Sequence, residues 1–201
     1  MIYSLPVLGY LLGSLSSAVI ICRLMGLPDP RSSGSGNPGA TNVLRFGNKL
    51  AAVLTLIGDL LKGLAPVLVA RWLDAGVLII AATATAAFLG HLFPLFFQFK
   101  GGKGVATAFG VYLALDLRLA MALLATWMII AFASRYSSLA ALSAAVLAPV
   151  YVYLISHQVA YVVTTTLIAI LILWRHQSNI QRLQAGQEDK IHLARKKSAR
   201  K

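Results

Sequence analysis

The sequence predicts an all-α polytopic membrane protein with seven transmembrane helices, and three observations carry that prediction. Hydrophobic residues make up 58% of the 201 residues and charged residues only 12%. With a mean hydropathy of +0.76, the chain is too apolar for an ordinary soluble domain. The apolar residues gather in segments long enough to span a bilayer. The basic residues lie between these segments, which indicates membrane topology and disfavours nucleic acid as the partner despite a net charge of +12.

Seven apolar segments are the expected spans, because a span requires roughly 17 to 25 mostly apolar residues. In chain order they cover residues 3–22, 50–70, 77–93, 105–117, 118–134, 139–155 and 159–174. The stretch 105–134 is the weak point, since it is too long for one upright helix and short for two. Asp116 and Arg118 lie near its middle. Whether the segment 105–117 crosses the bilayer fully is left open.

The distribution of charge favours two spans in the stretch 105–134, and therefore seven in all. With seven, all but three of the 18 lysines and arginines fall on one side, whereas six spans divide them far more evenly. The exceptions are Arg71 and Arg118 on the other side and Lys62 inside a span. The positive-inside rule then places the N-terminus outside and the C-terminus in the cytoplasm. We expect residues 1–188 to form one membrane domain and residues 189–201 a polybasic cytoplasmic tail attracted to anionic lipid.

The polar segment GSGNPGATNVLR, residues 34–45, follows the first span. Its glycines permit tight turns, and its neutral hydrogen-bonding side chains are Ser35, Asn37, Thr41 and Asn42. Arg45 can contact a phosphate through two N–H groups. No acid between Asp29 and Asp59 competes for that arginine. The segment is either an anion-binding loop or a polar linker.

A second glycine-rich segment, GHLFPLFFQFKGGKGVAT, covers residues 90–107. Its glycines Gly101, Gly102 and Gly104 surround Lys103 where an apolar helix begins, and backbone amides at such a place can approach an anion closely. The segment is not a Walker A loop, because a glycine follows the lysine. The alternative is a flexible turn with lysines at the membrane surface.

The cytoplasmic ends of the last two spans carry further polar residues. The stretch RHQSNIQRL, residues 175–183, brings Arg175, His176, Asn179 and Arg182 together if the helix continues. Arg175 by itself is better explained as a positive-inside anchor. Ser138, in the stretch RYSSL, is either a helix cap or a ligand-binding hydroxyl.

Inside the spans, Asp59 and Lys62 are spaced as a pair on one helix face, and they either stabilise the fold or orient the site. His91 is interpreted as hydrogen-bonded packing. The chain has one cysteine, interpreted as a packed thiol. Since no group of His, Asp and Glu has metal-ligand spacing, we expect neither a metal nor a cofactor.

On the seven-span topology the polar segments share the cytoplasmic face, which suits a reaction joining a phosphorylated molecule to an apolar one. The segments GSGNPGATNVLR, GHLFPLFFQFKGGKGVAT, RYSSL and NIQRLQAGQE occur in that order. Together they resemble the integral-membrane acyl-phosphate:glycerol-3-phosphate acyltransferases of bacterial phospholipid synthesis, over about residues 5–188. The related class that uses acyl-CoA or acyl carrier protein carries an H-x-x-x-x-D motif. None of the four histidines here is followed by aspartate at that spacing.

The resemblance implies transfer of a fatty acyl group from acyl phosphate to glycerol 3-phosphate, giving lysophosphatidic acid and phosphate. It further implies a multi-pass protein of the bacterial plasma (inner) membrane whose site faces the cytoplasm. Membrane lipid is an expected partner, and a contact with the enzyme that produces the acyl phosphate is left open. A phosphate transporter would need similar residues reachable from both faces. A non-catalytic scaffold would explain the basic tail but not the clustered glycines.

The resemblance also assigns roles to the polar residues. Glycerol 3-phosphate is expected to be held by Ser35, Arg45, Lys103, His176 and Asn179. The acyl-phosphate group is expected to lie against Asn37, Gly39, Thr41, Gly101, Gly102, Gly104 and Ser138. Lys103, His176 and Asn179 are the expected catalytic residues, because two neighbouring phosphates repel and their charge must be neutralised. The proton of the attacking hydroxyl goes either to His176 or to the departing phosphate.

Overall fold

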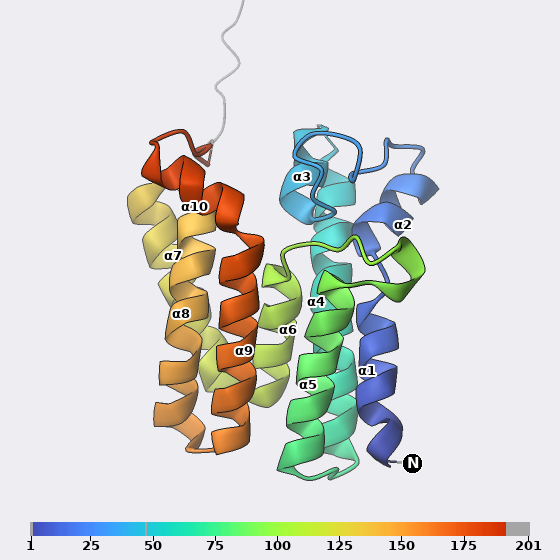
Figure 1. Ribbon diagram of the computed structural model, residues 1–201, viewed down its shortest axis with the longest axis vertical. Helices are drawn as coiled ribbons and strands as arrows, with labels where there is room; N and C mark the ends of the chain where they lie inside the picture. Colours follow the sequence, from blue (N-terminus) through green and yellow to red (C-terminus); the bar gives the residue numbers. More distant parts are fainter. Residues whose placement is uncertain (1, 47, 192–201) are drawn as a thin grey trace, which may run out of the picture.

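The regular structure of the chain is helical, and its long helices run side by side (Figure 1). The computed structural model describes residues 2–46 and 48–191, and these ranges contain no β-strand. The helices are α1 (Leu5–Gly13), α2 (Ser17–Leu24), α3 (Ala40–Arg45), α4 (Lys49–Trp72), α5 (Val77–Leu92), α6 (Val105–Leu115), α7 (Leu117–Ser134), α8 (Ser137–Ser156), α9 (Val159–Arg175) and α10 (Gln177–Gln184). Short 3-10 turns, η1 (Ile2–Ser4) and η2 (Leu95–Phe97), complete the order. The predicted all-α fold class is confirmed. Most of the predicted polybasic tail, residues 192–201, lies outside the described residues.

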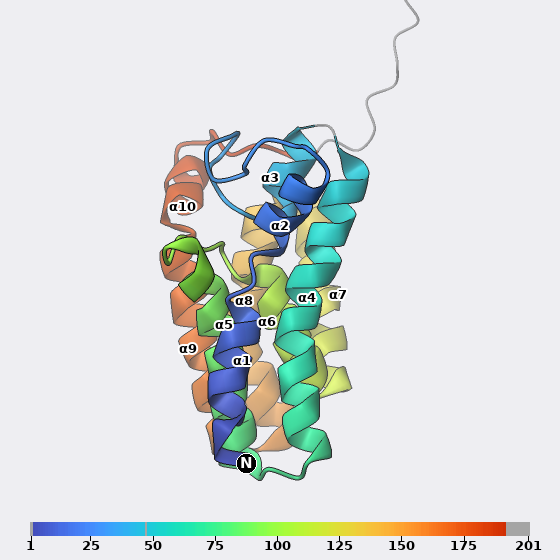
Figure 2. The same cartoon turned by 90° about the vertical axis from the view of Figure 1, so that its right-hand side faces the viewer.

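Views at right angles show a bundle whose two ends differ (Figures 1 and 2). The loop between α4 and α5 lies at the same end as the N-terminus, and α3 and α10 lie at the other end. Within the bundle α1 packs on α5, α4 on α6, and α8 on both α7 and α9. We call the end that carries α3 and α10 the polar end, and of the described residues it comprises 23–46, 48–49, 93–104, 135–138 and 175–191.

By length and composition, four helices of the described residues can cross a membrane: α4, α5 extended by η2, α7 and α8. The bent pairs α1–α2 and α9–α10, with angles of 45° and 61°, raise that number to at most six. The remaining apolar helix, α6, has 11 residues and is therefore about 16 Å long, roughly half of a hydrocarbon core. A helical membrane-spanning architecture is thus established, and the seventh span and the orientation of the termini stay predictions.

The short helix α6 explains how the stretch 105–134 accommodates two helices. Near the end of α4, Arg71 donates hydrogen bonds to the carbonyls of Ala114 and Leu115, where α6 ends. At mid-α4, a side chain on Gly63 would lie 2.2 Å from the carbonyl oxygen of Thr107, so the first turn of α6 lies against the middle of α4. The chain just before α6 is therefore the deepest part of the polar end and lies within the depth of the bundle. Irregular backbone at membrane depth is tolerated where protein surrounds it.

The first predicted span, 3–22, is broken rather than continuous. α1 ends at Gly13 and α2 begins at Ser17, and the carbonyl freed by the break is satisfied by the side chain of Lys62, whose Nζ lies 2.8 Å from Leu15 O. Lys62 also pairs with Asp59 at 2.9 Å. The intramembrane charge pair therefore stabilises the bend between α1 and α2, which is the structural role that the sequence left open.

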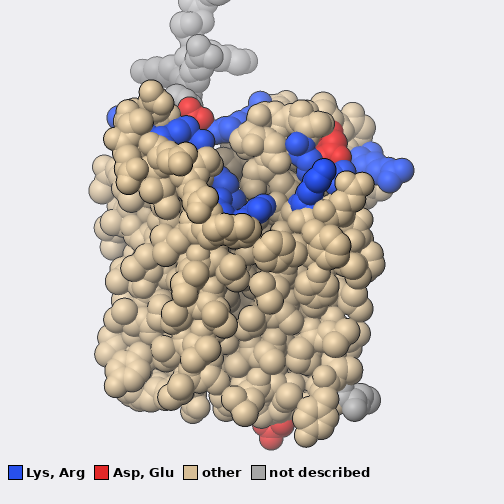
Figure 3. Space-filling view, viewed as in Figure 1, with Lys and Arg blue, Asp and Glu red and all other residues tan. Residues whose placement is uncertain are grey.

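Charge separates the two ends of the molecule. On the face shown in Figure 3, lysine and arginine side chains gather at the polar end, and the surface is hollowed between the parts that carry α10 and α3. At the opposite end, Arg118 pairs with Asp116 at 2.9 Å. This distribution supports the predicted topology, in which the polar end faces the cytoplasm.

Candidate functional site

The segment 34–45 is shaped by the side chain of Asn42, which is almost fully buried. Its Nδ2 donates to the carbonyls of Pro30 and Ser33, both at 2.9 Å, and its Oδ1 accepts from the amide of Ser35 at 2.8 Å. Gly34 has φ +63, and a side chain there would lie 2.3 Å from Asn42 Oδ1. Asn42, which the sequence suggested as a hydrogen-bonding group for a ligand, instead holds the loop together.

The predicted ligand residues of this segment lie around that fold. Ser35 and Thr41 are exposed, and Asn37 and Gly39 are half-buried beside each other. The side chain of Arg45 is 42% exposed and pairs with Asp189 at 2.7 Å. The loop's own sequence has no acid to compete for Arg45, but the fold supplies one from a distant part of the chain.

The segment 101–104 is held by residues far from it in sequence. Arg175 donates from Nε to the carbonyl of Gly102 at 3.0 Å and from a terminal nitrogen to the carbonyl of Gly101. The amide of Gly102 donates to the carbonyl of His91 at 3.3 Å, so it is already bonded where the sequence predicted an amide facing phosphate. Gly104 has φ +83 and begins α6. Arg175 contacts the proposed site directly, a role that its interpretation as a membrane anchor missed.

Two of the predicted site residues, Asn179 and Ser138, meet at the carboxylate of Glu188, and a third, Lys103, is bonded to Asn179. Asn179 donates to its Oε1 at 2.6 Å and Ser138 donates to the same oxygen at 2.7 Å. The Oδ1 of Asn179 in turn accepts from the ammonium of Lys103. Arg182 donates to the other carboxylate oxygen at 2.7 Å. The four side chains come from three separate segments; the carboxylate bonds to Ser138, Asn179 and Arg182 directly and is connected to Lys103 through Asn179.

The sequence assigns no separate role to Glu188. It occurs at the end of NIQRLQAGQE, where Gly186 has φ +69 and the amide of Gln187 donates to the carbonyl of Arg182 at 2.7 Å. This turn reverses the chain after α10 and brings the carboxylate back over the helix. A glycine just past a helix end is the usual sign of such a turn, and it was the available signal.

Burial and charge set the protonation of the site. Desolvation, with the positive charge of Arg182 next in size, lowers the pKa of Lys103 to about 8. Desolvation would raise the pKa of Glu188, but the hydrogen bonds from Ser138, Asn179 and Arg182 hold it below its usual value. The carboxylate is therefore ionised at neutral pH, and the ammonium of Lys103 is mostly, not fully, protonated.

His176 follows the last residue of α9 and is buried. Its Nδ1 lies 2.8 Å from the carbonyl of Ile172, and because a carbonyl only accepts, Nδ1 carries a proton. Desolvation lowers the pKa of His176 to about 4, although the bond to Ile172 opposes the shift. The neutral ring then has its lone pair on Nε2.

Below the segment 101–104 lies a buried cluster that includes His91. Its Nδ1 is 3.0 Å from Thr107 Oγ1 and 3.6 Å from Asp59 Oδ1. Its buried Nε2 has no hydrogen-bond partner within residues 2–46 and 48–191. The expectation that His91 packs with a hydrogen bond is confirmed at Nδ1. It does not explain why Nε2 is buried without a hydrogen-bond partner among the described residues.

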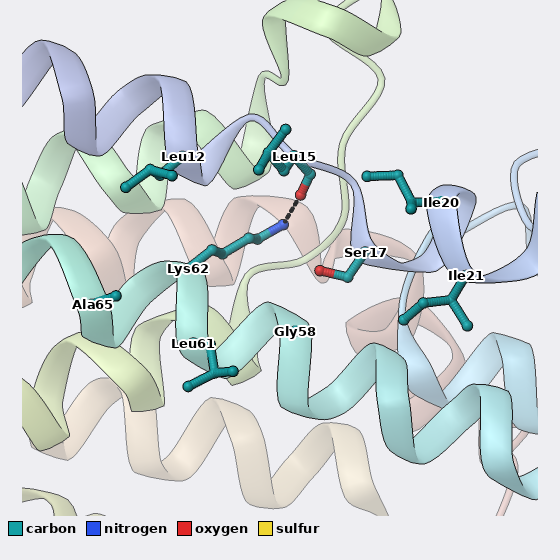
Figure 4. A pocket seen from close by; sticks show the side chains of 9 residues that line it. All are labelled: Leu12, Leu15, Ser17, Ile20, Ile21, Gly58, Leu61, Lys62 and Ala65. Carbon is teal, nitrogen blue, oxygen red and sulfur yellow. Dashed lines mark hydrogen bonds between the residues drawn. The ribbon is translucent and has the colours of Figure 1, made fainter. Parts of the chain in front are cut away.

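An apolar groove of about 390 Å³ opens beside the bend between α1 and α2 (Figure 4). Its walls are formed by Leu12, Leu15, Ser17, Ile20, Ile21, Gly58, Leu61, Lys62 and Ala65. The dashed line in Figure 4 is the bond from Lys62 to the carbonyl of Leu15. Through the pair of Lys62 and Asp59, the wall of the groove is connected to the cluster under the segment 101–104.

The two glycine-rich segments approach each other at one point, and an ion pair links the first of them to the chain after α10. The carbonyl of Pro38 lies 3.3 Å from where a side chain on Gly102 would begin, and the pair of Arg45 and Asp189 connects α3 to the chain after α10. The structure thus brings the predicted residues to one end of the bundle, with Lys103, Ser138 and Asn179 in one hydrogen-bonded group. In the described ranges, no group of three or more His, Cys, Asp or Glu side chains is arranged to hold a metal. Cys22 is buried and free, as expected.

Fold and site together define a helical membrane protein with a basic, polar site recessed into one end of its bundle. The family model for glycerol-3-phosphate acyltransferase matches residues 3–186, and the chain belongs to that family. Its sequence is 62% identical over 182 residues to the glycerol-3-phosphate acyltransferase of Thioalkalivibrio sulfidiphilus, covering 90% of each chain. The resemblance to glycerol-3-phosphate acyltransferases is therefore confirmed. The protein is an acyltransferase of membrane lipid synthesis.

Solved structures agree with this assignment. The crystal structure of PlsY, an integral membrane glycerol 3-phosphate acyltransferase, in its glycerol 3-phosphate form matches with a TM-score of 0.88 and 39% identity, covering 94% of each chain. The lysophosphatidic acid form of PlsY matches with a TM-score of 0.86 at the same 39% identity, covering 92% of this chain and 93% of that one. The integral membrane fold is therefore shared.

Proposed function

We propose that the protein transfers a fatty acyl group from acyl phosphate to glycerol 3-phosphate, the first acylation of phospholipid synthesis. The observation that carries this is the grouping of Ser138, Asn179 and Arg182 around the carboxylate of Glu188, at 2.6–2.7 Å. Donors that converge on a carboxylate in this way also suit phosphate oxygens. PlsY, with its glycerol 3-phosphate and lysophosphatidic acid forms, supports the same acceptor and product.

Acyl phosphate is an activated donor, so one displacement completes the reaction. The glycerol hydroxyl oxygen forms a bond to the acyl carbon, the bond from that carbon to the phosphate oxygen breaks, and inorganic phosphate leaves. Ser35, Arg45, Lys103, His176 and Asn179 would hold glycerol 3-phosphate, with Lys103 opposing the repulsion between the two phosphates. Asn37, Gly39, Thr41, Gly101, Gly102, Gly104 and Ser138 would surround the acyl-phosphate group, with Gly102 contributing shape because its amide is bonded to His91.

The hydroxyl proton goes, in this proposal, to the departing phosphate. The neutral His176, with Nδ1 bonded to Ile172 at 2.8 Å, presents Nε2 as an acceptor and orients the hydroxyl. Its pKa of about 4 makes it a weak base at neutral pH. His176→Gln, which keeps a hydrogen-bonding group, should retain measurable turnover, and complete loss with substrate binding intact would instead make the histidine the base.

The acyl chain would lie between helices, and the apolar groove beside α1, α2 and α4 suits it. The groove wall contains Lys62, whose partner Asp59 lies 3.6 Å from His91, next to the segment 101–104. A chain lying there would remain within the bilayer while its phosphate reaches Lys103.

The deciding assay supplies purified protein with labelled glycerol 3-phosphate and, in parallel, acyl phosphate, acyl-CoA or acyl carrier protein carrying the same chain. We expect lysophosphatidic acid and one equivalent of inorganic phosphate with acyl phosphate alone. Product formed from either thioester but not from acyl phosphate would overturn the proposed donor. The variant Lys103→Ala serves as the control for contaminating activity.

The proposed orientation, with the site on the cytoplasmic side of the bacterial inner membrane, has its own test. Cys22 is buried and can be replaced by serine, leaving a chain to which single cysteines are added. A membrane-impermeant maleimide added to intact spheroplasts should label Asp74→Cys and should label Ser32→Cys only after lysis. The reverse pattern would invert the orientation, and labelling of both in intact spheroplasts would refute it.

A further inference from the structure

The peptide that joins Gly101 to Gly102 lies between the side chain of Arg175 and the backbone of His91, two residues that no step of the proposed reaction requires. On one side Arg175 donates to the carbonyls of both glycines, at 3.0 Å for Gly102. On the other side His91 accepts the amide of Gly102 on its carbonyl at 3.3 Å. The segment is therefore bonded from α9 and from α5 at once, and its own sequence provides neither contact.

The ring of His91 occupies the place of a side chain at position 102. A Cβ on Gly102 would lie 2.4 Å from His91 Nε2 and 3.0 Å from the neighbouring ring carbon, and real Cβ atoms do not approach so closely. Gly102 does not have a positive φ, so alanine is compatible with its backbone. The severe conflict is with that ring and would disappear with it, whereas the carbonyl oxygen of Pro38, 3.3 Å away, would have to give by only a few tenths of an ångström.

The ring has little freedom to move aside. Its Nδ1 contacts Thr107 Oγ1 at 3.0 Å and lies 3.6 Å from Asp59, and Asp59 is itself paired with Lys62 at 2.9 Å. All four side chains are buried and come from α4, α5 and α6. A ring that projects from α5 and is held by groups on α4 and α6 is a rigid support for the segment above it.

We propose that His91 and Arg175 are positioning residues that fix the Gly101–Gly102 peptide, and that position 102 is glycine because the ring of His91 fills its side-chain space. The next residue, Lys103, then leaves the peptide in one direction, and its ammonium meets Asn179 Oδ1. We call His91 and Arg175, with the peptide that they fix, the clamp. The clamp acts on the substrates through Lys103. Its effect on activity rests on the proposed function, and its steric part does not.

Two simpler readings make different predictions. If Gly102 is glycine so that phosphate can approach its backbone, Gly102→Ala fails whatever residue stands at position 91. If Arg175 is needed only for its charge, lysine replaces it. The clamp predicts that the defect of Gly102→Ala depends on His91 and that the planar fork of Arg175, which reaches two carbonyls, is required.

The first experiment is a double-mutant cycle of Gly102→Ala and His91→Ala, with His157→Ala as the control histidine at the opposite end of the bundle. We expect Gly102→Ala to lower kcat/KM by about 10²-fold and His91→Ala by less. The double variant should recover at least fivefold over Gly102→Ala. Losses that simply multiply would overturn the steric part of the clamp.

The same cycle is read by thermal unfolding of the purified proteins without substrate. The melting temperature lost in Gly102→Ala should be partly regained in the double variant, and additive losses there would again contradict the clamp. If Gly102→Ala yields no folded protein, recovery of folded protein in the double variant supports the proposal and its absence opposes it. This readout holds even if the wild type transfers no acyl group, so failure of the clamp and failure of the proposed function are distinguishable.

The second experiment compares Arg175→Lys with Arg23→Lys, a conservative change at an exposed arginine of the same end. We expect Arg175→Lys to raise the KM for glycerol 3-phosphate at least tenfold while leaving the melting temperature within a few degrees, since Lys103 is displaced rather than the bundle unfolded. Arg23→Lys should match the wild type. Wild-type KM in Arg175→Lys would show that charge alone suffices and would overturn the role of the fork.

Discussion

The two glycine-rich segments of the site resemble each other in composition and are built by opposite means. Residues 34–45 are organised by Asn42, whose three hydrogen bonds all go to residues within twelve positions of it. Residues 101–104 are organised by Arg175 and His91, which the fold brings to them from other helices. The conformation of the first segment is therefore fixed by a residue within it, and that of the second by residues far from it in sequence.

The glycines of the two segments serve different purposes as a result. Gly34 adopts φ +63, a conformation that other residues reach at a cost, so it is needed for the path of the backbone. Gly102 has no unusual φ and is needed for space beside His91. Composition alone does not separate these two uses, although they respond differently to mutation.

The largest effect is expected at Lys103, the charged residue of the segment 101–104. Lys103→Ala removes the ammonium that meets Asn179 and should lower kcat/KM by about 10²–10³-fold, the usual loss for a group that stabilises developing charge. Lys49→Ala, at an exposed lysine of the same end, is the matched control and should stay within twofold. Substantial turnover in Lys103→Ala would place the chemistry outside this segment.

The local segment is tested next by Asn42→Leu, which preserves size and removes every hydrogen bond. The carbonyls of Pro30 and Ser33 and the amide of Ser35 lose their partner, each at a cost of about 1–3 kcal/mol where water does not replace it. We expect a lower melting temperature and a loss of activity of up to about 10²-fold through misplaced Ser35 and Arg45. Ser33→Ala keeps its carbonyl and should be neutral. An unchanged melting temperature in Asn42→Leu would show that other interactions fix the conformation of the loop.

The contrast between local and non-local construction also explains what the sequence could predict. The segments 77–93, 118–134 and 159–174 correspond closely to α5, α7 and α9, because an apolar run long enough to span a membrane is a property of the run itself. The break at residues 14–16 was missed, since the group that satisfies its freed carbonyl is Lys62, which lies in another helix.

The residues of the site likewise fall into those recognisable from their own segment and those defined by distant partners. Lys103, Ser138 and Asn179 were recognisable because each lies in a distinctive segment, and the fold does bring them together. Glu188 was not, since its meaning comes from three partners in α8 and α10. Arg175 contacts the carbonyls of Gly101 and Gly102, and His91 acts through its own carbonyl and the position of its ring, so neither contact can be read from the residue types involved. Patterns thus indicated the side chains that we propose to face a ligand, and missed those that hold other parts of the protein.

A smaller effect is expected at the carboxylate that joins the non-local group. Glu188→Gln keeps an oxygen that can accept from Ser138 and Asn179 and loses the charge opposite Arg182, so kcat/KM should fall by about tenfold. Exposed Gln184→Ala is the control. A rise in activity would mean that the carboxylate competes with substrate phosphate rather than orienting its partners.

The pH dependence isolates Lys103 from its neighbours. Its pKa of about 8 means that the ammonium is present below that pH and is lost above it, so kcat/KM, which reports the free enzyme, should fall severalfold from pH 7 to 9. A phosphate monoester, with a second pKa of about 6, is already a dianion throughout that interval. Lys103→Arg keeps its charge, and its residual activity should be flat over the same range. An equal fall in Lys103→Arg would assign the titration to another group.

The smallest effect is expected at the ion pair of Arg45 with Asp189, which links the segment 34–45 to the chain after α10. The two side chains are 42% and 77% exposed. Exposed pairs contribute about 0–1 kcal/mol, so Asp189→Asn should change kcat/KM by no more than about twofold and leave the melting temperature unaltered. Because Arg45 is released from a competing acid, any change in the KM for glycerol 3-phosphate should be downward. Steady-state kinetics at low and high salt measure both, with exposed Lys49→Ala as the reference for general screening. A tenfold loss would mean that the chain after α10 holds α3 in place, and the segment 34–45 would then depend on distant residues as much as the segment 101–104 does.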